Sequence, residues 1–170
     1  MGRLGFVGLI CSGVSLGLII ISMAIPYWVR RVNMYNNEVS SVRVFGLWTR
    51  CTLDKNEKEA TCYELKEVYE FVLAVRAFVL MGLFLVAFAA ILKMIHLFVL
   101  RENQNISILA GVSAIGAGIC MLIAVVIFAG RSNKLAEEEK VNYHVGFSLA
   151  VIAGIVALVS GVMFIVGKSD

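Results

Sequence analysis

The chain has 170 residues, of which 60% are hydrophobic and only 16% are charged. Soluble domains are about half apolar and about a quarter charged, so this composition excludes an ordinary soluble domain and indicates a lipid environment. The net charge of +3 comes without a basic patch interleaved with aromatic residues, which argues against a nucleic-acid partner. The length fits one domain covering residues 1–170.

Four long apolar runs dominate the chain. They cover Gly5–Ile25, Phe71–Leu92, Ile106–Ala129 and Val145–Val166. Each is about as long as the ~20 residues that cross a ~30 Å hydrocarbon core, and none has the polar stripe of a soluble amphipathic helix. A cleaved signal peptide is the alternative for the first run, but its apolar region would be about 7–15 residues. The sequence therefore predicts an all-α membrane protein with four transmembrane helices.

Four spans place both termini and the connection Lys93–Gln104 on one side of the membrane, and the loops Pro26–Glu70 and Arg131–His144 on the other. Lys and Arg are more frequent in the two loops, and the positive-inside rule alone would make those loops cytosolic. Two observations favour the reverse. Cys51 and Cys62 suggest an oxidising compartment, and the basic residues of the long loop are matched by acidic ones. We predict extracellular loops and cytosolic termini at the plasma membrane.

The long loop is predicted to form a small sheet. Residues Val42–Leu53 alternate and are rich in β-formers, Asp54–Glu59 is turn-like, and Ala60–Leu65 is typical of a returning strand. This arrangement would bring Cys62 opposite Cys51, and a disulfide there would contribute about 3 kcal/mol in the chain-entropy model. Two free thiols are the alternative.

Three features lie near the predicted membrane surface. Leu65–Phe71 has one apolar side and predicts a short helix leading into the second span. Trp28, just beyond the first span, is consistent with an aromatic anchor at the interface. Arg76 lies just inside the second span, where a charge suggests function by default, although a side chain that reaches the interface is an adequate explanation.

Several residues together form a pattern: Trp28, the run Phe45–Cys51 that contains Gly46, Leu47 and Trp48, and then Cys62 and Arg76. It resembles the signature of the superfamily of claudins, peripheral myelin and epithelial membrane proteins, the lens fibre membrane protein and calcium-channel γ subunits. The resemblance covers the layout of the whole chain. It implies a left-handed four-helix bundle topped by an antiparallel extracellular β-sheet. It also implies that Trp28, Leu47 and Trp48 seat the sheet on the bundle and that Arg76 is structural.

The same resemblance implies adhesion, junction formation or membrane organisation without catalysis. Two departures weigh against a tight-junction barrier. Only Gly167–Asp170 follows the fourth span, whereas barrier claudins usually carry a tail with a scaffold-binding motif. The loop Arg131–His144 has few apolar residues for head-on contacts. We therefore expect a protein closer to the myelin, epithelial or lens branch.

Seven residues of the two loops are candidates for an interaction surface: Arg43, Arg50, Glu64, Val68, Tyr69, Leu135 and Tyr143. We predict self-association in the membrane plane and contact with the same or a related protein on an apposed membrane. One alternative is a paracellular barrier or pore in which Arg43, Arg50 and Glu64 select ions. Another is an auxiliary subunit of a channel or receptor.

Small residues recur every four positions in several spans, which favours close helix packing. The fourth span carries two such faces, Gly146–Ala150–Gly154 and Ala153–Ala157–Gly161, so one of them is a candidate contact for a neighbouring molecule.

Cys11 lies near the cytosolic end of the first span and is a candidate for acylation. Cys120 is expected to be a small apolar residue of the third span. No metal, cofactor or catalytic constellation is predicted. Asn105–Ser107 matches a glycosylation sequon that would face the cytosol and stay unmodified.

Overall fold

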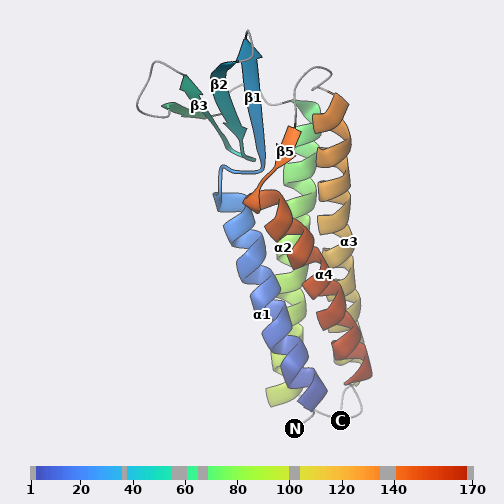
Figure 1. The fold of residues 1–170 in the computed structure, drawn as a ribbon. Coiled ribbons are helices and arrows are strands. Elements are labelled where there is room, and N and C mark those ends of the chain that lie inside the picture. The colour runs from blue at the N-terminus through green and yellow to red at the C-terminus, as the bar shows by residue number, and fades with distance from the viewer. Residues whose placement is uncertain are drawn as a thin grey trace.

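The computed structural model describes residues 3–35, 38–54, 61–64, 69–99, 104–134 and 141–167. Four long helices, α1 (Arg3–Ala24), α2 (Glu70–Phe98), α3 (Gln104–Lys134) and α4 (Val145–Val166), form an elongated bundle. A β-sheet stands at one end of the bundle, and both chain termini lie at the other (Figure 1). These are called the sheet end and the terminal end below.

All four helices are long and apolar enough to cross a membrane, which confirms the predicted four-helix membrane bundle. Within it, α2 contacts α3, α3 contacts α4, α4 contacts α1 and α1 contacts α2, so the helices close a ring. The interior is made largely of small side chains such as Ala114, Ala117 and Ala153, which are fully buried, whereas large ones such as Phe84 and Val126 face outward. This is the arrangement expected where lipid surrounds the helices and close backbone approach holds them together.

Serine hydroxyls link α1 to α4 along their length. Ser15 donates a hydrogen bond to the carbonyl of Ala153 over 2.9 Å. Ser160 donates to the carbonyl of Gly8 over 2.8 Å. Since no water competes in the hydrocarbon core, a buried hydroxyl there needs an internal partner, and each such bond contributes about 0.6 kcal/mol.

The second span runs past the end that the sequence suggested. Leu92 was expected to be its last residue because a lysine follows, but α2 continues to Phe98. Lys93 is fully buried. Its Nζ donates to the hydroxyl of Ser107 over 2.6 Å, and that hydroxyl donates to the carbonyl of Phe164 over 2.8 Å. The charged side chain thus turns into the bundle at the terminal end, and the helix does not stop.

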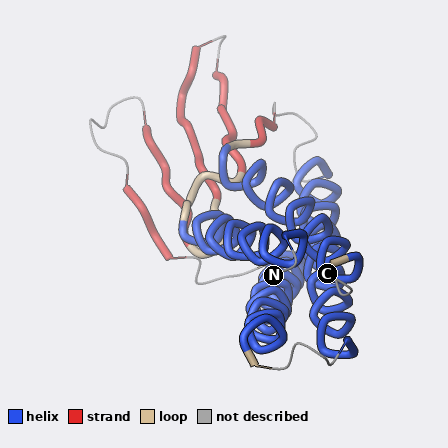
Figure 2. Tube along the Cα trace, turned by 90° about the horizontal axis from the view of Figure 1, so that it is seen from below, coloured by secondary structure: helices blue, strands red, loops and turns tan. Residues whose placement is uncertain are grey.

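The sheet contains β1 (Val29–Tyr35), β2 (Glu38–Phe45), β3 (Thr49–Asp54), β4 (Thr61–Glu64) and β5 (Val141–Tyr143). The strands lie in the order β4-β3-β2-β1-β5, and every neighbouring pair is antiparallel. Figure 2 shows them fanning out to one side of the helices. The short β5, from the second loop, joins the sheet beside β1 and so ties the two loops together.

The single strand predicted over Val42–Leu53 is wrong. The chain breaks after Phe45 and returns as β3, with the amide of Gly46 bonded to the carbonyl of Thr49 over 2.9 Å. Both halves have strand composition, so alternation alone did not reveal the turn between them. The basic strand β1 and the three-residue β5 were not predicted at all.

The returning strand expected over Ala60–Leu65 is confirmed as β4. Of the expected turn Asp54–Glu59, Asp54 ends β3 and the rest lies outside the described residues. Of the expected short helix Leu65–Phe71, the first part also lies outside them, while Glu70 and Phe71 belong to α2 itself.

Both small-residue faces of α4 are buried inside the bundle, so neither remains for a neighbouring molecule. A methyl group on Gly154 would lie 3.2 Å from the Cβ of Met121, and one on Gly161 would lie 2.7 Å from Ile115. By contrast, Gly13 and Gly17 of α1 have nothing within 4 Å of the Cβ position.

The tight α3–α4 contact yields a first prediction. A Cβ on Gly118 would lie 2.6 Å from Leu158 Cγ and 2.8 Å from the carbonyl of Gly154, whereas one on Gly116 would meet only Leu85 at 3.7 Å. Gly118→Ala should therefore lower stability by about 1–3 kcal/mol through overpacking, measured as the thermal midpoint in detergent. Gly116→Ala, on the same helix, should leave the midpoint unchanged or slightly higher. Equal midpoints for the two variants would contradict this packing.

Candidate functional site

Trp28 is the centre of the junction between sheet and bundle. Its side chain is 0% exposed. The indole nitrogen donates to the carbonyl of Ser22 over 2.7 Å. The ring packs edge-on against Phe128 at 5.1 Å and Phe147 at 6.5 Å. Such pairs contribute about 0.5–1.5 kcal/mol beyond area burial. The tryptophan is therefore packed beneath the sheet rather than placed as an anchor in the lipid interface.

The backbone around Trp28 connects three elements. Its amide donates to the carbonyl of Phe45 at the end of β2, and its carbonyl accepts from the amide of His144, both over 3.0 Å. The carbonyl of Tyr27 accepts from the amide of Gly146 at the start of α4 over 2.9 Å. The link between α1 and β1 is thus bonded both to β2 and to the entry of the last span.

Two glycines permit this close approach. A Cβ on Gly46 would lie 2.6 Å from the Cα of Pro26, a backbone atom that cannot swing aside. A Cβ on Gly146 would lie 2.6 Å from Cδ1 of Trp28. Packing against Pro26 therefore requires a glycine at position 46, in the Gly-Leu-Trp run. Packing against Trp28 requires one at position 146, on the opposite side of the junction.

Arg76 fastens the other side of the junction. Its Nε and Nη2 both donate to the carbonyl of Leu47, over 2.8 Å and 2.6 Å. The guanidinium also lies 4.5 Å from the ring centre of Trp48. Leu47 is fully buried in the same core cluster as Trp28. Trp48, however, is 40% exposed and rests on the arginine. Of the residues expected to seat the sheet, Trp28 and Leu47 share the core, and Trp48 packs separately.

The structure confirms the predicted disulfide. Cys51 of β3 and Cys62 of β4 are register partners and are covalently joined. All four residues of β4 are exposed, so this strand has little buried surface to hold it. Closing the short loop constrains the unfolded chain by about 3 kcal/mol in the entropy model. The bridge therefore holds an otherwise weakly attached edge strand on the sheet.

The seven candidate contact residues fall in different environments. Arg43 and Arg50 are half-buried and line a pocket between the sheet and the bundle. Glu64 and Tyr69 are exposed. The Tyr143 hydroxyl donates to the carbonyl of Ala129 over 3.3 Å, and its ring stacks on that of Phe147. Val68 and Leu135 lie outside the described residues.

Two free cysteines lie within the spans. Cys11 of α1 and Cys120 of α3 are both half-buried thiols. Acylation of Cys11 stays a prediction. Within the described ranges, no cluster of His, Cys, Asp or Glu has the size needed to hold a metal ion.

Sequence reasoning missed three contributors to the junction: Ser22, Pro26 and Gly146. The hydroxyl of Ser22 donates to the carbonyl of Gly146 over 2.7 Å, while its own carbonyl accepts from Trp28. Pro26 is the chain's single proline, and Gly146 lies at the start of α4. The sequence signal for Pro26 was a lone proline just after the first span, and that for Gly146 was a glycine at the start of the fourth. Both are compatible with a close backbone contact.

These features define a multi-pass membrane protein of the tetraspan type. It has four apolar spans, a disulfide-held antiparallel sheet at one end, and a junction beneath the sheet built on a tryptophan and an arginine. The model of the PMP-22/EMP/MP20/Claudin family matches residues 3–164. The chain belongs to that family of structural, non-enzymatic membrane proteins, and its place is in a lipid bilayer at the plasma membrane.

The arginine contact yields a second prediction. Arg76→Lys keeps the charge but cannot give two parallel hydrogen bonds to one carbonyl or stack flat on Trp48. We expect a loss of about 1–3 kcal/mol, seen as a lower thermal midpoint together with faster hydrogen exchange of the Gly46–Thr49 segment. Arg131→Lys, at an exposed arginine of the same end, is the matched control. Unchanged exchange in the Arg76 variant would show that the carbonyl finds another donor.

Proposed function

We propose that this protein is an adhesive, non-enzymatic tetraspan that self-associates through its sheet at cell–cell contacts. The observation that carries this proposal is the edge strand β4. All four of its residues are exposed, with Tyr63 at 64%, and the strand is covalently held at the border of the sheet. An exposed edge presents unpaired backbone groups that favour pairing with another chain.

A second feature supports contact through the sheet. The face of the sheet opposite Phe45 is apolar, with Val42, Val44 and Leu53 beside the disulfide. These residues line a hollow of about 230 Å³ together with Tyr27, Arg30 and His144. Apolar surface rimmed by polar groups is typical of protein contacts.

The alternatives draw less support from the described residues. A paracellular pore needs its selecting charges to line the path of the ions. Of the three candidates, Glu64 is exposed, whereas Arg43 and Arg50 line a pocket between the sheet and the bundle. An auxiliary-subunit role would need a surface shaped for a different membrane protein, and the features above favour contact between sheets instead.

We also propose that the sheet is extracellular and the termini are cytosolic. The disulfide supports this orientation, because such bonds persist in oxidising compartments. Glycosylation tests it. Lys58→Thr creates an Asn-X-Thr sequon at Asn56, in the segment between β3 and β4. We expect this variant, expressed in animal cells, to gain an endoglycosidase-sensitive glycan, while the native sequon at Asn105 stays bare. A glycan at Asn105, with none at Asn56, would reverse the orientation.

The adhesive role is tested with vesicles. Proteoliposomes bearing the protein should cluster, and the double variant Thr61→Lys/Tyr63→Lys should cluster several-fold more slowly, because lysines on an edge strand oppose pairing. Gln104→Lys adds a charge at the far, terminal end and should behave as the unmodified protein.

A claudin reconstituted in parallel shows that the assay reports adhesion. If claudin vesicles cluster and those bearing this protein do not, the adhesive proposal fails. If the edge variant clusters at the original rate, self-association does not use β4.

A further inference from the structure

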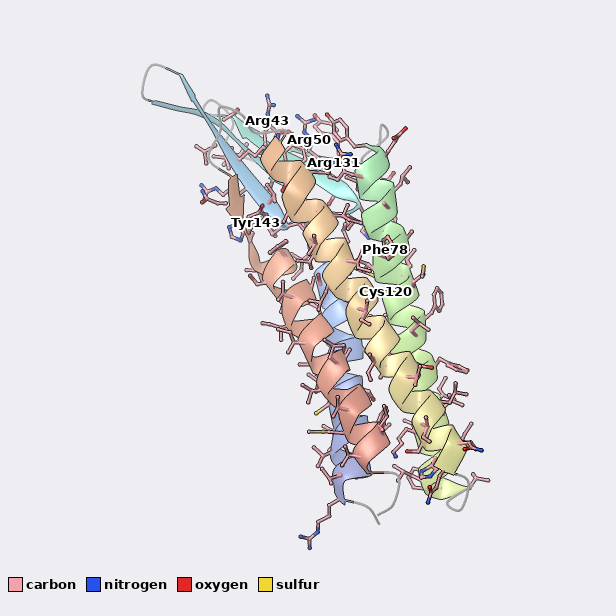
Figure 3. All side chains as sticks on the ribbon, turned by 90° about the vertical axis from the view of Figure 1, so that its right-hand side faces the viewer. Arg43, Arg50, Phe78, Cys120, Arg131 and Tyr143 are labelled. Atoms are coloured by element: carbon pink, nitrogen blue, oxygen red, sulfur yellow. A yellow bond between two sulfur atoms is a disulfide. The ribbon has the colours of Figure 1, made fainter. Side chains whose placement is uncertain are left out.

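Three arginines converge on one pocket between the sheet and the ends of the helices. Arg31, Arg43 and Arg50 come from β1, β2 and β3, and they line a cavity of about 210 Å³. Its other walls include Phe45 of the sheet, Phe71 of α2 and Phe128 of α3. Arg43 and Arg50 appear with Arg131 at the sheet end of the molecule in Figure 3. The pocket thus combines a cationic side with apolar, aromatic walls.

The strand register forces these like charges together. Arg31 and Arg43 are direct partners across β1 and β2. Arg50 is the partner of Phe45 across β2 and β3, and the guanidiniums of Arg31 and Arg50 lie 5.3 Å and 5.1 Å from the centre of the Phe45 ring. Like charges placed opposite each other on neighbouring strands are destabilising. Among the described residues this arrangement carries a cost.

Two of the three guanidiniums also have a buried donor without an acceptor. Nε of Arg31 and Nε of Arg43 are buried without a hydrogen-bond partner. Among the described residues, the acceptor found for this trio is the carbonyl of Ser132, 3.5 Å from Nη2 of Arg31. A buried donor left unpaired loses its hydration without compensation. Both the charge repulsion and the unpaired donors would be relieved by an anion in the pocket.

The location of the pocket suggests the source of the anion. Phe71 and Val72 lie at the start of α2, and Phe128 and Ser132 lie near the end of α3, so the pocket is at the level where two membrane spans leave the hydrocarbon core. Whole ligands usually occupy about 300–1,000 Å³, so a smaller cavity fits a headgroup rather than a complete lipid. Planar guanidinium forks match the oxygens of phosphate and sulfate groups.

We propose that this pocket binds the phosphate or sulfate group of an acidic membrane lipid. The lipid chains remain in the bilayer, and the oxyanion sits among the three arginines beneath the sheet. The site is separate from the edge strand β4 and from the apolar outer face, so it does not depend on the adhesive role proposed above.

The test uses the full chain in nanodiscs of phosphatidylcholine alone, or of phosphatidylcholine with phosphatidylglycerol or sulfatide. Both leaflets then carry the same lipids, so the result does not depend on orientation. We expect acidic lipid to raise the thermal midpoint and to be retained in native mass spectra. Arg43→Gln/Arg50→Gln should lose that rise and bind acidic lipid about tenfold more weakly or worse.

In neutral lipid the double variant should be at least as stable as the unmodified protein, because like charges have been removed from the site. Arg30→Gln is the control for loss of a positive charge from the sheet: it removes one arginine, and Arg30 lines the hollow on the opposite face. This control should keep the full response to acidic lipid. Should the double variant lose its fold, Arg43→Lys, which keeps the charge but not the fork, should give a partial loss.

Three results would overturn the proposal. One is an equal response to acidic lipid in the double variant and the unmodified protein. Another is a full response to inorganic sulfate or phosphate in neutral nanodiscs with no added effect of acidic lipid, which would assign the pocket to a free anion. The last is arginine-dependent self-association in neutral lipid, which would assign it to an acidic side chain of a second copy.

Discussion

The burial of Trp28 is the constraint on which the rest of the junction depends. A wholly enclosed indole needs a partner for its nitrogen, and the last turn of α1 supplies it through the carbonyl of Ser22. It also needs room, which Gly146 leaves at the entry of α4. Once the ring is seated, the main chain on either side of it is positioned to bond Phe45 and His144. The orientation of the sheet thus follows from one side chain packed among three helices.

The bilayer explains why buried serine hydroxyls bond to carbonyls of neighbouring helices. Backbone and hydroxyl groups without water must be paired within the protein, and Ser15 and Ser160 pair theirs across α1 and α4. Arg76 and Lys93 act at opposite ends of α2, each reaching an oxygen that closes the bundle: the carbonyl of Leu47 at the sheet end and the hydroxyl of Ser107 at the terminal end. The charges in this span therefore join elements together.

The sequence allowed the four spans, the disulfide and the family pattern to be predicted, because each has a signal in hydropathy or spacing. It did not reveal the break between β2 and β3, since Gly46 is explained only by the approach of Pro26, a contact between distant segments. It also did not reveal β1, because its consecutive arginines give no strand signal, and only the structure shows that Arg31 and Arg30 line hollows on opposite faces of the sheet. Both features depend on contacts between distant segments, and the composition or alternation within one segment does not predict such contacts.

The two faces of the sheet carry different chemistry, and this separation has a consequence for how the protein works. The bundle-facing side holds Arg31, Arg43 and Arg50, and the Nε atoms of Arg31 and Arg43 are buried without a partner, while the outer side holds the disulfide and apolar residues. An anion bound beneath the sheet would stabilise its seat without covering the outer face or β4. The contacts made by the sheet and the binding of the anion both involve strands β2 and β3. The rigidity of these strands would therefore link the contacts of the sheet to the lipid composition of the membrane.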